Sequence, residues 1–99
     1  MSERYASFVR RVRETVLGRP AVTEPGLRQA VAVGTPPPDL GPFVAKVARR
    51  AYDVTQQDVD ALRRAGYSED AIFEIIASAA LGAGLARLER GLAALRGEV

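Results

Sequence analysis

Glu74 is the residue whose type and surroundings offer the clearest chemistry in this sequence. It is the only ionisable side chain between Asp70 and Arg87, and Ser78 follows it at a spacing that places both on one face of a helix. If Glu74 faces a protein-lined cavity, loss of water would raise its pKa and suit it to proton transfer. The alternative, which the sequence favours, is that Glu74 pairs with an arginine and has a structural role.

A second set of polar side chains lies in residues 46–58. Tyr52 could offer its phenol to a ligand, which makes Glu74 and Tyr52 the candidate catalytic pair, although a packed ring with a wet hydroxyl is the commoner arrangement. Asp58 is more typical of a helix start than of a general base. Lys46 and Arg49 could hold a carboxylate or phosphate, or could simply form a solvated helix face. The candidate ligand-binding residues are therefore Ala51, Val54, Asp58, Lys46, Arg49 and Ser78.

The composition excludes several kinds of chemistry. The chain has no cysteine and no histidine. Disulfides, thiol nucleophiles and thiolate metal sites are therefore impossible, and the side chain best suited to proton transfer near neutral pH is missing. Gly82 and Gly84 do not form a phosphate loop, because no strand precedes them and no Gly-Lys-Ser/Thr follows. We predict no metal site and no cofactor.

Charge and hydropathy restrict the partners and the location. The net charge is +2, from 14 basic and 12 acidic residues, which is too small to argue for nucleic acid. The cluster Arg10, Arg11 and Arg13 has no interleaved aromatic residues on which bases could stack. The N-terminus lacks an apolar signal core, and the apolar stretch around Glu74 is short for a membrane span. We expect a cytoplasmic protein that binds neither nucleic acid nor a membrane.

The spacing of apolar residues predicts five helices and no strands. They cover residues 3–17, 23–34, 39–53, 55–66 and 68–96. Thr23 is the expected N-cap of the second helix, and Thr55 with Asp58 forms a capping box for the fourth. Gly66 closes the fourth helix and Ser68 caps the fifth.

Apolar residues on one side of each helix define the expected core. On the first four helices they are Tyr5, Phe8, Val9, Val12, Val16, Leu27, Ala30, Val31, Phe43, Val44, Val47, Ala48, Ala51, Val59 and Leu62. The first half of the fifth helix is apolar on nearly every side, which is typical of a central or interface helix. Its second half carries a seam for one partner helix, formed by Leu81, Leu85, Leu88, Leu92 and Leu95.

Two features of the fifth helix point to close packing and self-association. Gly82 and Gly84 each cost roughly 1 kcal/mol of helix stability relative to alanine, so we expect close helix approach, a kink or a break at this point. Hydrophobic residues make up 47% of the 99 residues, which is more apolar surface than a small bundle easily buries. We therefore predict a homo-oligomer.

The segment ALRRAGYSEDAIFEII resembles the carboxymuconolactone decarboxylase and AhpD-like family. Many members of that family have a helix that ends in a leucine–arginine–x–alanine–glycine step, followed by a serine-capped, acid-started helix. The matching residues are Leu62, Arg63, Ala65, Gly66, Ser68, Glu69, Asp70, Ile72 and Phe73, and the resemblance extends over residues 40–95. It implies an all-α, AhpD-like bundle that assembles into trimers or hexamers.

The resemblance also implies which redox residues of the family are missing from this chain. Redox-active relatives carry a Cys-x-x-Cys pair and a histidine before the leucine–arginine step. Counting back from Leu62 places the two cysteines at Ala51 and Val54 and the histidine at Asp58. Peroxide reduction needs a reactive thiolate and a second, resolving thiol, which alanine and valine cannot supply.

We therefore expect one domain over residues 1–99, with N-terminal helices and a proline-rich connector (1–38) and a family-like core (39–96). The expected function is non-redox: an oligomeric AhpD-like domain that binds a small molecule or a protein partner, without peroxidase activity. The alternative is a cofactor-free enzyme of proton-transfer, lactone or decarboxylation chemistry that uses Glu74 and Tyr52. A third hypothesis is a structural subunit that completes a complex with a separately encoded partner.

Overall fold

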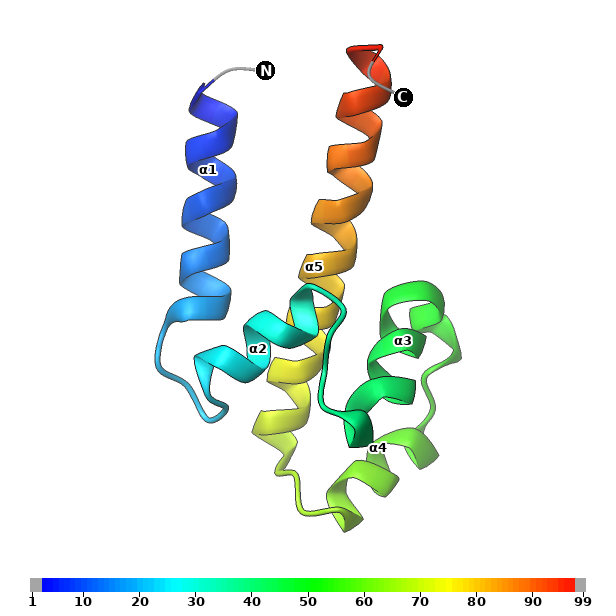
Figure 1. Cartoon of the computed structure of the whole chain (residues 1–99). Helices are drawn as coiled ribbons and strands as arrows, with labels where there is room; N and C mark the ends of the chain where they lie inside the picture. Colours follow the sequence, from blue (N-terminus) through cyan, green and yellow to red (C-terminus); the bar gives the residue numbers. More distant parts are fainter. Residues whose placement is uncertain (1–2, 98–99) are drawn as a thin grey trace.

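The computed structural model describes residues 3–97, and over that range the chain is built from helices without strands, as the sequence predicts (Figure 1). Short 3-10 or π-helical turns, labelled η, extend or precede the main helices. In chain order the elements are α1 (Glu3–Arg13), η1 (Glu14–Gly18), α2 (Pro25–Ala32), η2 (Pro38–Leu40), α3 (Gly41–Arg50), η3 (Ala51–Asp53), α4 (Gln56–Arg64) and α5 (Glu69–Leu95).

The long helix α5 is the axis of the molecule. Its first half packs against α2 and α3, and α4 lies across its beginning (Figure 1). Its second half runs beside α1, and both extend beyond the packed helices toward the same end of the molecule. One long-range ion pair joins them, between Arg13 Nη2 and Glu89 Oε1 at 3.5 Å.

The core lies where α2, α3 and the first half of α5 meet. Leu40 and Ile75 are completely buried, and Val31 of α2 belongs to the same cluster. The N-terminal segment therefore shares the core of the family-like segment. Among the expected core residues, the structure buries Val31, Phe43, Val44, Val47 and Leu62. The side chain of Tyr5 lies outside the described part of the structure.

Two expected core residues are exposed. Ala51 is exposed because Arg50 adopts non-helical angles (φ −146°, ψ 57°), which end α3 and take Ala51 out of register with Val47. Phe8 on α1 is 58% exposed, because no described helix covers that part of its surface. The predicted burial of these two residues is wrong.

Three of the four predicted helix-end signals are confirmed. The capping box of Thr55 and Asp58 starts α4, Gly66 closes it with a φ of +106°, and the hydroxyl of Ser68 accepts a hydrogen bond from the amide of Ala71. The prediction for Thr23 is wrong: Glu24 is the N-cap of α2, and no side chain caps that helix. The hydroxyl of Thr23 is committed to Glu74 instead.

The two central glycines of α5 have different roles. A Cβ atom on Gly82 would lie 2.0 Å from the carbonyl oxygen of Ala32, so this glycine allows α2 to approach α5 closely. A Cβ atom on Gly84 would meet nothing within 4 Å. The helix continues through both positions from Glu69 to Leu95. The predicted close approach is therefore confirmed at Gly82 alone.

By length and composition, α5 could cross a membrane. It has 27 residues and a mean hydropathy of 1.6 over its most apolar window, and it extends beyond the apolar stretch around Glu74 that the sequence marks as short. A buried core helix has the same properties, and 39% of that window is buried inside the protein.

Candidate functional site

Glu74 anchors the loop between η1 and α2. Its Oε1 atom accepts hydrogen bonds from the amide of Thr23 at 2.8 Å and from the Thr23 hydroxyl at 2.6 Å. Its Oε2 atom accepts a third hydrogen bond, from the amide of Val22 at 3.1 Å. The two carboxylate oxygens therefore hold the loop against α5.

Arg28 supplies the positive charge of this cluster. It is 3% exposed, and its guanidinium donates to the carbonyl oxygens of Val16, Arg19 and Thr23. Its Nε atom is buried and has no hydrogen-bond partner among the described residues. Sequence reasoning missed Arg28, although it is the only ionisable residue in α2, which is the same signal that singled out Glu74.

The pKa of Glu74 lies below its ordinary value. The hydrogen bond from the Thr23 hydroxyl is the largest cause, the loop amides and the positive charge of Arg28 act in the same direction, and burial opposes them. This direction is opposite to the raised pKa that the enzyme hypothesis requires of Glu74. Glu74 is a fully ionised acceptor at neutral pH whose oxygens are already engaged.

Ser78 follows Glu74 on α5 but does not extend the site. Its hydroxyl is completely buried and donates to the main-chain carbonyl oxygen of Glu74 at 2.8 Å. Ser78 therefore lies one turn after Glu74 on the same helix face, as its spacing predicts. Its hydroxyl bonds to the backbone of Glu74 and not to the carboxylate.

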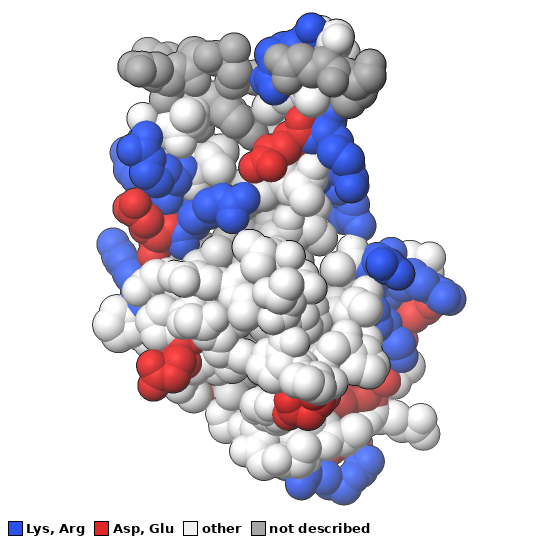
Figure 2. All heavy atoms as spheres, viewed as in Figure 1, with Lys and Arg blue, Asp and Glu red and all other residues white. Residues whose placement is uncertain are grey.

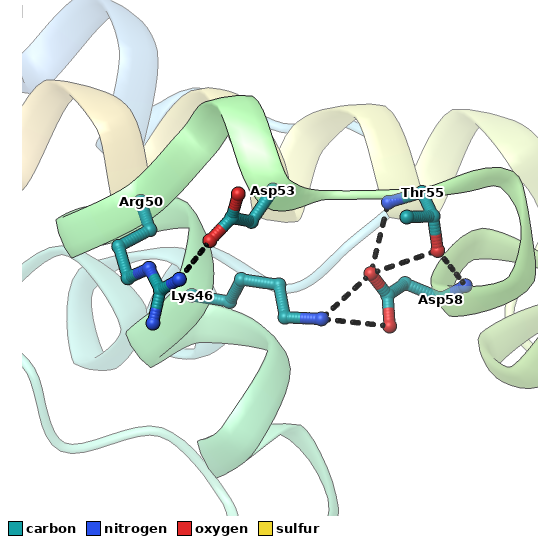
Figure 3. Close-up of polar contacts among 5 residues, drawn as sticks. All are labelled: Lys46, Arg50, Asp53, Thr55 and Asp58. Atoms are coloured by element: carbon teal, nitrogen blue, oxygen red, sulfur yellow. Dashed lines mark hydrogen bonds and ion pairs between the residues drawn. The ribbon is translucent and has the colours of Figure 1, made fainter.

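A charged cluster that includes Asp58 joins α3 to the start of α4 (Figure 3). Lys46 reaches across from α3, and its Nζ atom donates to both carboxylate oxygens of Asp58, at 3.2 and 3.0 Å. The amide of Thr55 donates to the same carboxylate at 2.9 Å. A separate ion pair joins Arg50 and Asp53 beside it.

This cluster is built to hold α3 against the start of α4. The amide of Thr55 is the largest cause of the lowered pKa of Asp58, and Lys46 lowers it further. Asp58 is therefore ionised and serves as the acceptor of a capping box, which agrees with the structural interpretation of its sequence position.

The other predicted site residues are spread over the surface. Tyr52 is 84% exposed on η3, Ala51 is exposed beside it, and Val54 packs partly against the core. Arg49 is exposed at the end of α3. The structure thus brings Lys46 and Asp58 together and gives Tyr52 no contact with Glu74.

Three hollows lie near these residues. A groove of about 640 Å³ lies between α3, α5 and residues 31–36, and Arg49 is one of the residues that line it. A hollow of about 330 Å³ lies beside Glu74 and Phe73. A third, of about 410 Å³, adjoins Lys46 and Asp53. None of these three is lined by both Glu74 and Tyr52, so none brings the candidate catalytic pair to one ligand.

An apolar surface runs along α5 on the side that faces away from the core. Gly84 is nine residues, or two and a half turns, from the buried Ile75, so the two lie on opposite faces. Phe73, Leu88 and Leu95 on this face are 68%, 43% and 83% exposed. Steps of three and four residues connect the members of this surface, the outer stripe: Phe73, Ala77, Ala80, Gly84, Leu88, Gly91 and Leu95.

The outer stripe differs from the leucine seam that the sequence predicts. Leu81, Leu85 and Leu92 of that seam are partly buried, whereas Leu88 and Leu95 are exposed on the outer stripe. The signal that could have located it is the absence of charge, since none of its seven positions carries an ionisable side chain.

Comparison of the chain with protein-family models, curated proteins and solved structures gives no match. Within residues 3–97, no three carboxylates come together in a group that could hold a metal ion.

Proposed function

We propose that this chain is a non-redox, AhpD-like domain that acts by assembly, in which two copies pair along the outer stripe of α5. The observation that carries the proposal is the exposure of Phe73, Leu88 and Leu95 on one uncharged helix face. Contiguous apolar surface of this kind is typical of a protein–protein interface. A helix face that excludes charge over its whole length is best buried against another helix.

The local structure supports the AhpD-like part of the proposal. Leu62 of the family-like motif is buried, Gly66 takes the left-handed conformation, and Ser68 caps α5. The positions of the missing thiols hold Ala51 and Val54, so the scaffold has no electron-transfer chemistry of its own.

The pairing that fits the outer stripe is antiparallel. Phe73 and Leu95 each lie eleven residues from Gly84, which is therefore the midpoint of the stripe. A two-fold axis at Gly84 sets Gly84 of one copy against Gly84 of the other. It also sets Ala80 of each copy against Leu88 of the other. Small residues at the centre allow the helices to approach closely, and large residues fill the space on either side.

The charges of α5 favour the same direction. Its first half carries Glu69, Asp70 and Glu74 and no basic residue, while its second half carries Arg87 and Arg90 with one acid, Glu89. Antiparallel pairing keeps the two acidic first turns apart and opposes the two helix dipoles, whereas parallel pairing would place like charges at the same level.

A hollow at one end of the stripe can accept the exposed side chain from the other end. The hollow of about 330 Å³ is lined by Phe73, Ala77 and Val16, among others. Antiparallel pairing about Gly84 brings Leu95 of the second copy to the level of Phe73. In each half of the interface an exposed leucine thereby reaches the apolar part of a hollow whose lining also includes Arg19, Arg28 and Glu74.

The symmetry of this interface determines the possible assemblies. A two-fold contact uses the same surface on both copies, so any assembly built on it contains an even number of chains. The proposal therefore favours a dimer, or a hexamer composed of three dimers, over a trimer. We also propose that the domain lies in the cytoplasm and that the outer stripe faces protein and not lipid.

Sedimentation velocity of the chain and of the variant Ala80→Glu tests the proposal. Ala80→Glu puts a charge at the centre of the outer stripe, and we expect it to shift the wild-type dimer or hexamer to smaller species. Ala61→Glu, at an exposed position of α4, is the matched control and should leave the assembly unchanged. A monomeric wild type, or an Ala80→Glu variant that assembles like wild type, would contradict the proposal.

A further inference from the structure

The groove between α3, α5 and residues 31–36 has an apolar floor. Val44 and Ala79 line it and are 4% and 2% exposed, so they form its closed side. Small side chains of α5, Ala83 and Ala86, continue the apolar lining toward the open end. The volume of about 640 Å³ lies within the range of small-molecule sites in proteins.

The rim of the groove is basic. Arg49, Arg87 and Arg90 line it, and no aspartate or glutamate does. Figure 2 shows the corresponding gathering of basic side chains over the second half of α5 and the end of α3. Arg87 Nη2 donates to the carbonyl oxygen of Ala48 at 2.6 Å, which ties α5 to the last turn of α3.

Two of the three arginines have no counter-charge. Arg49 and Arg90 are exposed and make no hydrogen bond or ion pair with any described residue. The groove therefore combines a buried apolar floor with free guanidinium groups at its edge, and guanidinium groups bind carboxylate and phosphate through paired hydrogen bonds.

We propose that this groove binds a small amphiphile, with its apolar chain along Val44, Ala79 and Ala83 and its anionic head group between Arg49 and Arg90. The chain would displace water from the apolar floor, and the head group would neutralise the two unpaired arginines. The shared requirement is one apolar chain with one anionic head, which either a fatty carboxylate or an alkyl phosphate provides.

The size of the groove favours such a molecule over a helical peptide. From Ala79 to Arg90 the groove follows eleven residues of α5, or about 16 Å. A helix is about 10 Å across with its side chains, so it needs a much broader opening than a single extended chain does. A single extended alkyl chain fits without separating α3 from α5.

This inference is independent of the assembly proposed above. The groove and the outer stripe lie on different sides of α5, because Ala79 is buried on the core side and Ala80 is exposed on the outer side. A chain that fails to dimerise can still bind the amphiphile, and a chain that dimerises can leave the groove empty.

Calorimetric titration of the full-length chain with dodecanoate, dodecyl phosphate and dodecanol, below the concentrations at which they aggregate, tests the inference. We expect one molecule bound per chain for at least one of the two anions, and affinity about tenfold weaker for dodecanol, which lacks the charge. Binding of one anion and not the other identifies the head group. Equal affinity for dodecanol, or no binding of either anion, would overturn the inference.

Substitutions locate the site. Arg49→Gln and Arg90→Gln each remove one unpaired charge at an exposed position and should weaken anion binding about tenfold without altering the fold. Ala86→Leu should block the groove sterically. Arg64→Gln, at an exposed arginine of α4 outside the groove, is the control and should bind like wild type. Unchanged affinity in both Arg49→Gln and Ala86→Leu would place the ligand elsewhere and refute the assignment.

Discussion

Thr23 and Glu74, which are 51 residues apart in the chain, are joined by two hydrogen bonds, from the hydroxyl and the amide of Thr23 to one carboxylate oxygen of Glu74. Thr23 therefore does not cap α2. The carboxylate of Glu74 is engaged with the loop and is not available as a general acid. Together they fix the loop between η1 and α2 to the second turn of α5.

Replacement of Glu74 by glutamine should lower the free energy of unfolding by about 2 kcal/mol at pH 7, because a charged acceptor of three hydrogen bonds becomes neutral. Urea unfolding followed by circular dichroism measures the change. Glu89→Gln is the control: its ion pair with Arg13 is exposed, so the expected loss is below about 0.5 kcal/mol.

The effect of Glu74 should also depend on pH. Its pKa in the folded chain lies below the ordinary value of 4.5, so its contribution to stability is complete above pH 4.5 and is lost as the pH falls through the lower, folded-state pKa. The difference between wild type and Glu74→Gln should therefore shrink in acid. A difference that stays constant down to pH 2 would show that the carboxylate charge is not what stabilises the loop.

Gly82→Ala should destabilise the chain by about 2 kcal/mol or more, because the new methyl group meets the backbone of Ala32, which cannot move aside as a flexible side chain can. Within one copy Gly84→Ala meets no atom and should raise the stability of the monomer by up to about 1 kcal/mol through helix propensity. Thermal unfolding at several protein concentrations separates these effects from any change in assembly. Equal effects of the two substitutions would be inconsistent with the close contact of α2 and α5.

Thr55→Ala should cost about 1 kcal/mol of unfolding free energy, because the hydroxyl accepts from the amide of Asp58 and caps α4. Thr35→Ala is the matched control, since the Thr35 hydroxyl is exposed and makes only a long bond of 3.4 Å to the carbonyl oxygen of Ala30. Chemical denaturation of both variants provides the comparison. A loss at Thr35 as large as the loss at Thr55 would rule out a specific capping contribution.

The purified chain should not consume hydroperoxide beyond the rate of buffer, because it has no thiolate to attack the O–O bond. An assay that follows organic hydroperoxide loss, with dithiothreitol as electron donor, measures this. Turnover that scales with protein concentration would contradict the non-redox part of the proposed function.

The sequence predicted most of the local structure because local chemistry determines it. The cap at Ser68, the capping box at Thr55 and the left-handed turn at Gly66 each depend on residues within one helical turn, and all three are confirmed. The helical period likewise located the buried residues of α3.

The remaining features depend on contacts between distant segments. Thr23 has the sequence signature of a cap, but α2 has Glu24 as its N-cap, and the Thr23 hydroxyl lies against Glu74 and donates to its carboxylate. The different roles of Gly82 and Gly84 depend on where α2 crosses α5, which the pattern of α5 alone does not contain. The same holds for Arg28, whose partners lie in η1 and in the loop that follows it.

The most direct test of pairing along α5 uses the absence of native cysteine. A single Gly84→Cys substitution places one thiol at the proposed two-fold axis, and a disulfide requires Cα atoms within about 7 Å of each other. We predict rapid formation of a covalent dimer on mild oxidation of Gly84→Cys and little for Ala61→Cys, which lies on α4. Cross-linking at Ala61→Cys as fast as at Gly84→Cys, or none at Gly84→Cys in a chain that sediments as an oligomer, would contradict the proposed interface.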